Sequence, residues 1–102
     1  MNKVIVEVTI VPLGTASTSL SSYVADVEKV LKKYPHIKTQ LTPMSSILEG
    51  DLDEILRVLR EMHETPFSKG AQRVSTRISI DDRRDKETSM ERKVAAVKEK
   101  LS

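Results

Sequence analysis

Apolar and polar residues alternate along the first regular segment of the chain, from Val4 to Val11. A period of two in a segment this rich in β-branched residues predicts a β-strand near the centre of a sheet. One face is entirely apolar and is expected to point to the core: Val4, Val6, Val8 and Ile10. The other face is mixed and contains Lys3, Ile5, Glu7, Thr9 and Val11.

The apolar spacing then changes to three and four residues, which predicts amphipathic helices over about 20–34 and 52–64. Ser19 is the expected N-cap of the first helix, and Pro35 is expected to stop it. Asp51, with a glutamate three residues later, is the expected N-cap of the second helix. The second helix is expected to bury Leu52, Ile55, Leu56, Leu59 and Met62.

A third helix is predicted to begin at Thr88, where Thr88-Ser89-Met90-Glu91 fits a Ser/Thr-x-x-Glu capping box. Its apolar stripe is narrow and consists of Met90, Val94, Val97 and Leu101. A stripe this narrow indicates a helix on the rim of the domain or against a neighbouring subunit.

Three further strands are predicted, over about 37–42, 46–49 and 72–81. Gly50 is expected to end the second of these, and residues 65–70 are expected to form a loop. The order β-α-β-β-α-β predicts an α+β, ferredoxin-like sandwich in a single domain over residues 1–102. Its four-stranded antiparallel sheet has the first and third strands in the middle, both core helices on one face, and a C-terminal helix in addition.

The opposite face of this sheet has no predicted cover. Its outer residues come from the first and last strands: Ile5, Glu7, Thr9, Val11, Arg73, Ser75, Arg77 and Ser79. Such a mixed face favours a wet subunit interface or a ligand site between subunits. The alternative interpretation is a plain solvated sheet face.

Composition narrows the classes of function. Charged residues make up 31% and apolar residues 38% of the 102 residues, as in soluble globular proteins. There is no apolar run long enough for a bilayer and no signal-peptide pattern, so a cytoplasmic location without a membrane partner is expected. The absence of cysteine excludes disulfides and thiolate chemistry. Because the net charge is only +2 and the strands carry no aromatic residue, nucleic-acid binding is not expected.

Little in the sequence indicates catalysis or a metal site. His36 and His63 lack metal-ligand spacing and are expected at the surface. The loop over residues 12–19 is rich in Gly, Ser and Thr and precedes a helix, so it can offer hydroxyl and amide groups to a small ligand. Glu49 closes a central strand and is expected either to accept hydrogen bonds from an amino-bearing ligand or to pair with Arg77.

Several segments, in the right order, resemble the thiamine-binding-like family, also called the MTH1187/YkoF-like group or uncharacterised protein family 0045 (UPF0045). The matching segments are Ile10 to Thr15, Ser19 to Ala25, Leu41 to Met44, Ile47 to Asp51, Gly70 with Arg73-Val74, Ile80 to Arg83 with Asp85-Lys86, and Lys93-Val94. The resemblance covers nearly the whole chain. It implies a ferredoxin-like domain that forms homodimers or homotetramers and binds thiamine or its hydroxymethylpyrimidine moiety, with no established catalysis and no required cofactor.

The resemblance also implies ligand-binding positions, which in this chain are Pro12, Gly14, Thr15, Ser19, Thr42, Met44 and Glu49. The chemistry is compatible, because Glu49 can accept from the amine of an aminopyrimidine and hydroxyl groups can satisfy its ring nitrogens. One departure bears on ligand identity. The family usually reads Met-Gly-Thr where this chain has Met44-Ser45-Ser46, which adds a side chain at Ser45 and removes a methyl group at Ser46.

The leading hypothesis is therefore a non-enzymatic, oligomeric binder of thiamine or a related pyrimidine. The alternative is an assembly module whose uncovered sheet face and third helix hold partners together without a small ligand. A third interpretation, an acylphosphatase-like enzyme, needs an arginine in the loop after the first strand, and none lies between Pro12 and Tyr23.

Overall fold

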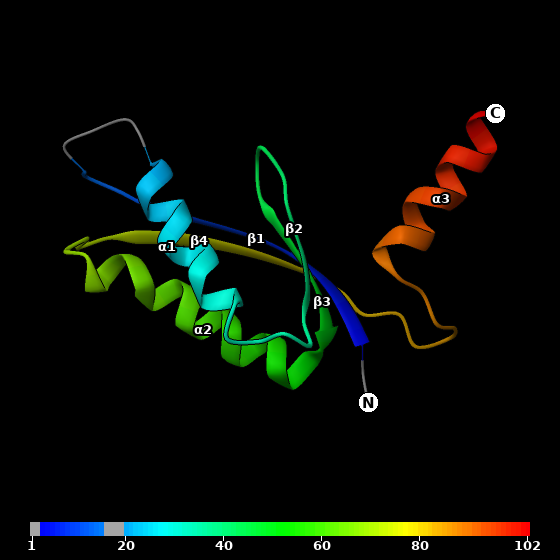
Figure 1. Ribbon diagram of the computed structural model, residues 1–102, viewed down its shortest axis with the longest axis horizontal. Helices are drawn as coiled ribbons and strands as arrows, with labels where there is room; N and C mark the ends of the chain where they lie inside the picture. The colour runs from blue at the N-terminus through cyan, green and yellow to red at the C-terminus, as the bar shows by residue number, and fades with distance from the viewer. Residues whose placement is uncertain (1–2, 16–19) are drawn as a thin grey trace.

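The computed structural model describes residues 3–15 and 20–102. Its elements are β1 (Lys3–Pro12), α1 (Ser21–Leu31), β2 (Lys38–Leu41), β3 (Ser46–Asp51), α2 (Leu52–Ser68), β4 (Val74–Asp81) and α3 (Met90–Leu101). The four strands form one antiparallel sheet in the order β2-β3-β1-β4. This arrangement confirms the predicted ferredoxin-like topology, with the first and third strands in the middle and a helix added at the C-terminus (Figure 1).

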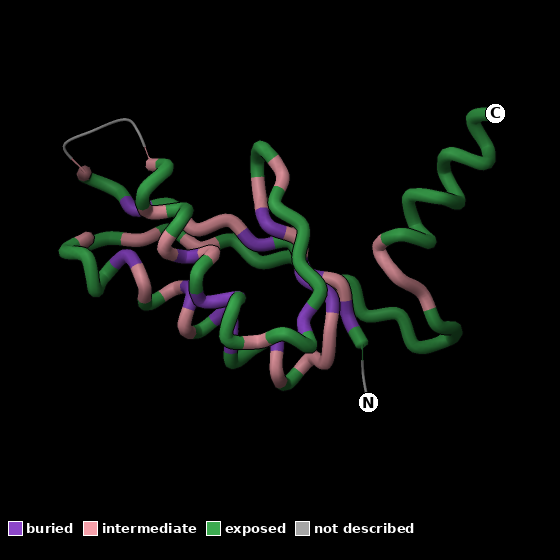
Figure 2. The backbone as a smooth tube through the Cα atoms, viewed as in Figure 1, coloured by how far each residue is buried: buried purple, intermediate pink, exposed green. Residues whose placement is uncertain are grey.

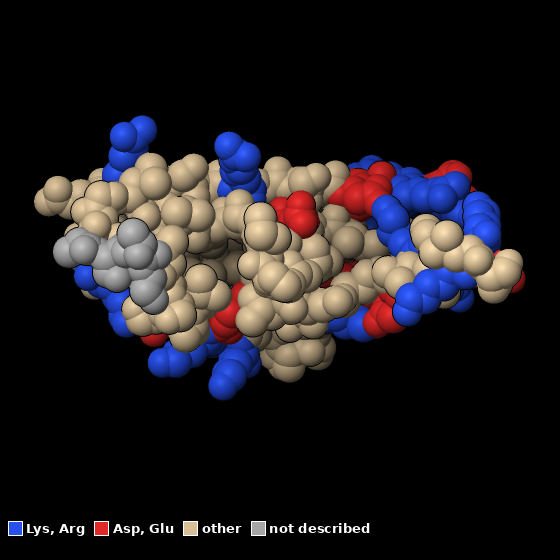
Figure 3. Space-filling view, turned by 90° about the horizontal axis from the view of Figure 1, so that it is seen from above, with Lys and Arg blue, Asp and Glu red and all other residues tan. Residues whose placement is uncertain are grey.

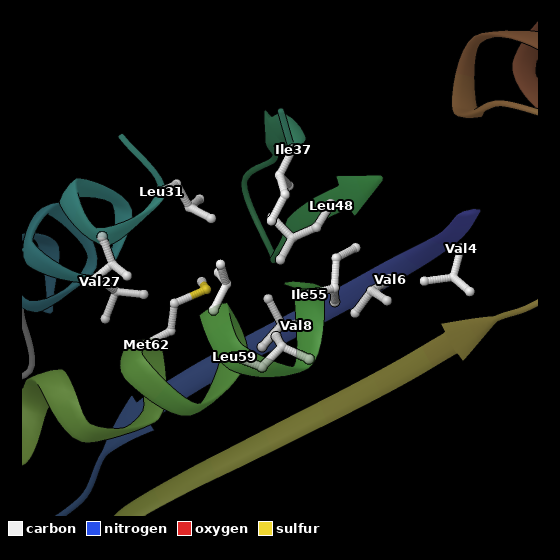
Figure 4. Close-up of a cluster of buried hydrophobic side chains, with 12 residues drawn as sticks. Val4, Val6, Val8, Val27, Leu31, Ile37, Leu48, Ile55, Leu59 and Met62 are labelled. Carbon is white, nitrogen blue, oxygen red and sulfur yellow. The ribbon is translucent and has the colours of Figure 1, made fainter. Parts of the chain in front are cut away.

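The hydrophobic core lies between one face of the sheet and the helices α1 and α2. The alternation along β1 is confirmed, because Val4, Val6 and Val8 are all at most 2% exposed. They pack with residues of α2 and β3, and Figure 4 shows these side chains pointing toward one another from the sheet and the two helices. Buried positions follow this layer and are absent from α3 (Figure 2). Burial of this one face is the main source of stability.

The register of the sheet places the mixed residues of β1 together with polar residues of β4 on the other face. Glu7 lies opposite Ser79, and Thr9 lies opposite Arg77. α2 lies on the core side of the strands, whereas α3 projects away from the other side (Figure 1). The predicted uncovered face is therefore present, and among residues 3–15 and 20–102 the C-terminal segment approaches it near Glu49 and Asp81.

The second helix is longer than predicted. α2 continues through residues 65–68, which were expected to be a loop, and the ring of Pro66 is fully buried in its last turn. A proline so close to the end of a helix removes one hydrogen bond, and burial of its ring offsets that loss. Gly70 then ends the helix with a φ of 99°. Leu56 was expected in the core but is 47% exposed, and Val58 takes the buried position instead.

Other boundaries also differ from the prediction. α1 ends at Leu31 rather than Tyr34, and the predicted cap Ser19 lies outside the described residues. The cap of α3 is Ser89 rather than Thr88, since the Ser89 hydroxyl accepts a hydrogen bond from the Arg92 amide at 3.1 Å.

Two strand boundaries are shifted as well. β4 begins at Val74, two residues later than predicted. Gly50 lies inside β3 instead of ending it. A Cβ atom at Gly50 would come within 3.3 Å of Ile37 Cγ1, so close packing rather than a turn accounts for this glycine.

Two leucines of the β2–β3 hairpin lie on the same face of the sheet and test how far the core extends along it. Leu48 is 0% exposed, so Leu48→Ala should lower the free energy of unfolding by about 2–5 kcal/mol through lost burial and the cavity left behind. Leu41 is 61% exposed, and the control Leu41→Ala should change it by no more than about 0.5 kcal/mol. Urea denaturation measures both variants. Equal losses would contradict this limit of the core.

Candidate functional site

A cleft of about 140 Å³ opens between α1 and the β2–β3 hairpin. Its walls come from β1, from α1 and from the hairpin tip, and the surface is visibly hollowed there (Figure 3). Of the loop that the sequence suggested for a small ligand, the described residues 12–15 do not line this cleft. The cleft exists because α1 packs chiefly against α2 and leaves the adjacent part of β1 uncovered.

The lining of the cleft is largely apolar. It contains Val8, Ile10, Val11, Leu20, Val24, Val27, Met44 and Met62. Val8, Val27 and Met62 also belong to the hydrophobic core, so the cleft reaches the core at its floor. Apolar walls with a few polar groups are typical of sites for small organic ligands.

One carboxylate, that of Glu28, lines this apolar cleft. The Ser46 hydroxyl, only 8% exposed, donates a hydrogen bond to Glu28 Oε1 and so links β3 to α1 across the cleft. Glu28 was not predicted as a site residue, because a charged residue beside an apolar helix stripe is usually exposed to solvent. The available signal was its spacing of four from Val24 and eight from Leu20, which puts the three residues on one side of the helix.

Thr42 and Met44, two of the expected ligand positions, shape the hairpin side of the cleft. The Thr42 hydroxyl accepts hydrogen bonds from the amides of Ser45 at 3.0 Å and Met44 at 3.3 Å, and donates to the Ser45 carbonyl at 2.9 Å. Met44 is 84% exposed and lines the cleft. Thr42 therefore holds the turn, and Met44 supplies an apolar wall.

A second hollow, of about 360 Å³, lies on the uncovered sheet face on the other side of the hairpin tip. Thr9, Met44 and Ser45 line both this hollow and the cleft. Glu7 and Arg77 supply its charged groups, and the Ser45 hydroxyl donates to Glu7 Oε2 at 2.8 Å. A ligand larger than the cleft could extend into this neighbouring space.

The expected loop residues lie elsewhere. Gly14 and Thr15 line a third hollow, of about 380 Å³, together with Tyr23 and Arg73. Pro12 is buried at the end of β1. Ser19 lies outside the described residues. The structure therefore brings Met44 to the cleft and places Gly14 and Thr15 in a neighbouring hollow.

Glu49 lies on the opposite sheet face from the cleft, beneath the start of α3. It is 3% exposed, and its Oε1 accepts a hydrogen bond from the Met90 amide at 2.7 Å. Lys3 and Lys38 lie 3.8 and 3.7 Å from Oε2, so lysines rather than Arg77 are its charged partners. A buried carboxylate at a helix N-terminus interacts favourably with the helix dipole. Glu49 thus anchors α3.

Lys38 extends this anchor to the helix itself by an ion pair with Glu91. The hydrogen bond between them lowers the pKa of the Glu91 carboxyl and raises the pKa of Lys38. Both changes favour the charged forms of Lys38 and Glu91, so this ion pair supports the α3 anchor.

The histidine expectation is wrong for His63. Its ring is half-buried, with Nδ1 2.7 Å from the Thr76 hydroxyl and an edge-on contact to Phe67 at 5.5 Å between centroids. His36 is exposed, as expected. Within residues 3–15 and 20–102, no group of three or more His, Asp or Glu side chains is arranged to hold a metal ion. Among the helices of this described part, none is long and apolar enough to cross a bilayer.

Comparison with known proteins adds a family to this geometry. The model of the family described as thiamine-binding protein matches residues 6–98. The chain belongs to this thiamine-binding protein family. Its relatives include UPF0045 protein YqgV of Bacillus subtilis, 50% identical over 95% of this chain and 96% of the relative. A UPF0045 protein of Methanothermobacter thermautotrophicus is 45% identical over 93% of this chain and 96% of its own length.

Solved structures of similar proteins share the fold. The hypothetical protein MJ1052 of Methanocaldococcus jannaschii is 44% identical and superposes with a TM-score of 0.88, over 97% of this chain and 99% of that one. A Thermotoga maritima protein proposed to act in thiamine biosynthesis or salvage, TM0486, has a TM-score of 0.75 over 93% and 98% of the two chains. At 21% identity, that second similarity concerns the fold alone.

The position of Glu49 in this family member gives a direct test of its anchoring role. Glu49→Gln removes the charge beneath α3, and the Met90 amide loses a charge-assisted hydrogen bond worth roughly 1–2 kcal/mol. Hydrogen exchange at residues 90–93 should therefore become about tenfold faster. Glu64→Gln, at an exposed position of α2, is the matched control and should leave this exchange unchanged. Unaltered exchange in Glu49→Gln would contradict the anchor.

Proposed function

We propose that the protein binds thiamine or its hydroxymethylpyrimidine moiety in the cleft between α1 and the hairpin, with the pyrimidine ring inside. The size of the cleft is the observation that carries this proposal. An apolar cavity of roughly 150 Å³ holds one benzene ring, and the cleft has about 140 Å³ with largely apolar walls. It therefore suits one six-membered ring, while a second ring would extend into the hollow beyond Met44 and Ser45.

The proposal is one of binding without catalysis. The two serines of the cleft donate to the carboxylates of Glu28 and Glu7. In these hydrogen bonds each serine is paired with a carboxylate and not with a histidine or lysine base. The family is also named for binding rather than for a reaction. Thiamine is accordingly treated as the bound ligand and not as a cofactor.

Calorimetric titration tests the ligand. Thiamine and hydroxymethylpyrimidine should bind with affinities within about tenfold of each other, because the same ring fills the cleft, and the isolated thiazole should not bind. No heat and no thermal shift at millimolar ligand would overturn the proposal in favour of an assembly module.

A pair of neighbouring variants on α1 locates the site. Val24 lines the cleft, so Val24→Phe should fill it and weaken pyrimidine binding by more than tenfold in the same titration. Ala25 is exposed beside it and does not line the cleft, so Ala25→Phe should bind like the natural sequence. Equal affinity of the two variants would place the ligand elsewhere.

We also propose that the protein self-associates as a homodimer or homotetramer through α3 and the uncovered sheet face. The apolar stripe of α3 is exposed, with Val94 at 54% and Val97 at 59%. A helix of 12 residues is marginal on its own in water, so α3 needs a packing partner. A groove of about 340 Å³ beside Met90 and Val94 separates this stripe from Gln40 of β2.

A second copy of the chain would supply a partner for the α3 stripe and for the uncovered sheet face at once. Each chain offers an unpartnered helix stripe and an uncovered sheet face, and a two-fold axis pairs identical surfaces reciprocally. Ile5 and Ile47 are half-buried and provide apolar area on that face next to its charged groups. The alternative function, an assembly module without a small ligand, draws on this same surface.

Light scattering at micromolar concentration tests the assembly. The natural sequence should have the mass of two or four chains, and Val97→Glu should shift it toward one chain by placing a charge in the stripe. Ala96→Glu adds the same charge to the same helix outside the stripe and should leave the mass unchanged. A monomeric mass for the natural sequence would refute the assembly proposal.

A further inference from the structure

We infer that Glu28 is the specificity-determining residue of the cleft, which selects ligands carrying a ring amino group over those carrying a ring oxygen at the same position. The inference rests on the proposed function, because it assigns a role within the proposed pyrimidine site. It differs from the expectation for Glu49, which is engaged beneath α3 on the other sheet face.

The position of Glu28 supports this role. It follows Leu20 and Val24 at intervals of four on the side of α1 that lines the cleft. Ser46 donates to its Oε1, which fixes the carboxylate against the hairpin. A carboxylate offers about four lone-pair sites on two oxygens, so one serine leaves acceptor capacity for a ligand.

The apolar residues around Glu28 make its remaining acceptor capacity selective for ligand groups that donate hydrogen bonds. In a cleft with largely apolar walls the half-buried carboxylate has less water around it than an exposed one, so it gains more from an incoming N–H donor. A ligand oxygen at the same place would put one hydrogen-bond acceptor next to the carboxylate, another acceptor, and neither would gain a donor. By contrast, Glu7 lies exposed on the open face, where water competes for the same interaction.

Ser46 takes part as a positioning residue. It is 8% exposed and reaches Glu28 from β3, a central strand of the sheet. The carboxylate is therefore held from the rigid part of the fold, although it belongs to the helix wall. Rigid support of this kind is what a specificity group needs in order to discriminate by hydrogen bonding.

The experiment compares two ligands on three forms of the protein. Hydroxymethylpyrimidine with its 4-amino group and the analogue with a 4-oxo group are titrated against the natural sequence, Glu28→Gln and Glu64→Gln. The natural sequence and the exposed control Glu64→Gln should prefer the amino ligand by about tenfold or more. Glu28→Gln should lose about tenfold in affinity for the amino ligand and little for the oxo ligand, since the glutamine amide can donate to oxygen.

The outcomes separate this inference from the proposed function. Binding by the natural sequence with an unchanged amino preference in Glu28→Gln would overturn the inference and leave the function standing. Equal losses for both ligands would make Glu28 a structural support only, and would also overturn it. Failure of the natural sequence to bind either ligand would remove the proposed function and this inference together.

A second variant keeps the test informative if Glu28→Gln is poorly folded. Ser46→Ala retains the carboxylate and removes the hydroxyl that holds it. The amino preference should then fall by a smaller factor than in Glu28→Gln, with the loss again confined to the amino ligand. An intact preference in a folded Ser46→Ala variant would overturn the inference.

Discussion

The fold depends on burying one face of a single strand. β1 lies between β3 and β4, and its alternate valines form the part of the core that both helices share. Because the side-chain period of a strand is two, a shift of one residue in its pairing would expose these valines and bury Glu7 and Thr9. The register with β3 and β4 is therefore fixed by hydrophobic burial. The positions of the cleft and of the uncovered sheet face both follow from that register.

The cleft and the uncovered face are two consequences of the same arrangement. α2 runs along the sheet and covers the middle of its core side, and α1 packs mainly on α2. One stretch of β1 beneath α1 is then left open, and it becomes the floor of the cleft. On the other side no helix of the βαββαβ unit packs, and α3 meets the sheet through Glu49, through Lys38 and through an ion pair between Lys93 and Asp81 of β4. Basic and acidic side chains are mixed over the end of the molecule that carries α3 (Figure 3).

Much of this fold was predictable, because apolar residues recur at every second position in the strands and at every third or fourth position in the helices. The faces of β1, the strand order and the position of both core helices followed from the alternation and from the rule of right-handed crossovers. The errors have local causes. Residues 65–70 were predicted to form a loop, yet α2 continues through Pro66, because burial of its ring outweighs one lost hydrogen bond. Leu56 was predicted to be buried but is exposed, whereas Val58 is buried. Hydrophobicity alone does not fix how far a helix is rotated about its axis against a sheet.

The candidate site was harder to predict, because it depends on contacts between distant segments. Glu28 and Ser46 are 18 residues apart and meet only when α1 and β3 have packed. Glu49 was correctly singled out as unusual, but its partner is a backbone amide 41 residues later, which no local pattern reveals. The family resemblance indicated the loop and the hairpin. In the folded chain the hairpin residues Met44 to Ser46 line the cleft, whereas Gly14 and Thr15 of the loop line a separate hollow.

The family resemblance implies a glycine where this chain has Ser45, and the backbone there accommodates a side chain. Every described residue with positive φ is a glycine, so Ser45 adopts an ordinary conformation and its side chain adds no strain. The hydroxyl then tethers the hairpin tip to Glu7 of the central strand. This tether places the tip between the cleft and the hollow on the uncovered face, and Thr9, Met44 and Ser45 line both spaces. The serine in place of the expected glycine therefore adds a contact between the hairpin and the central strand.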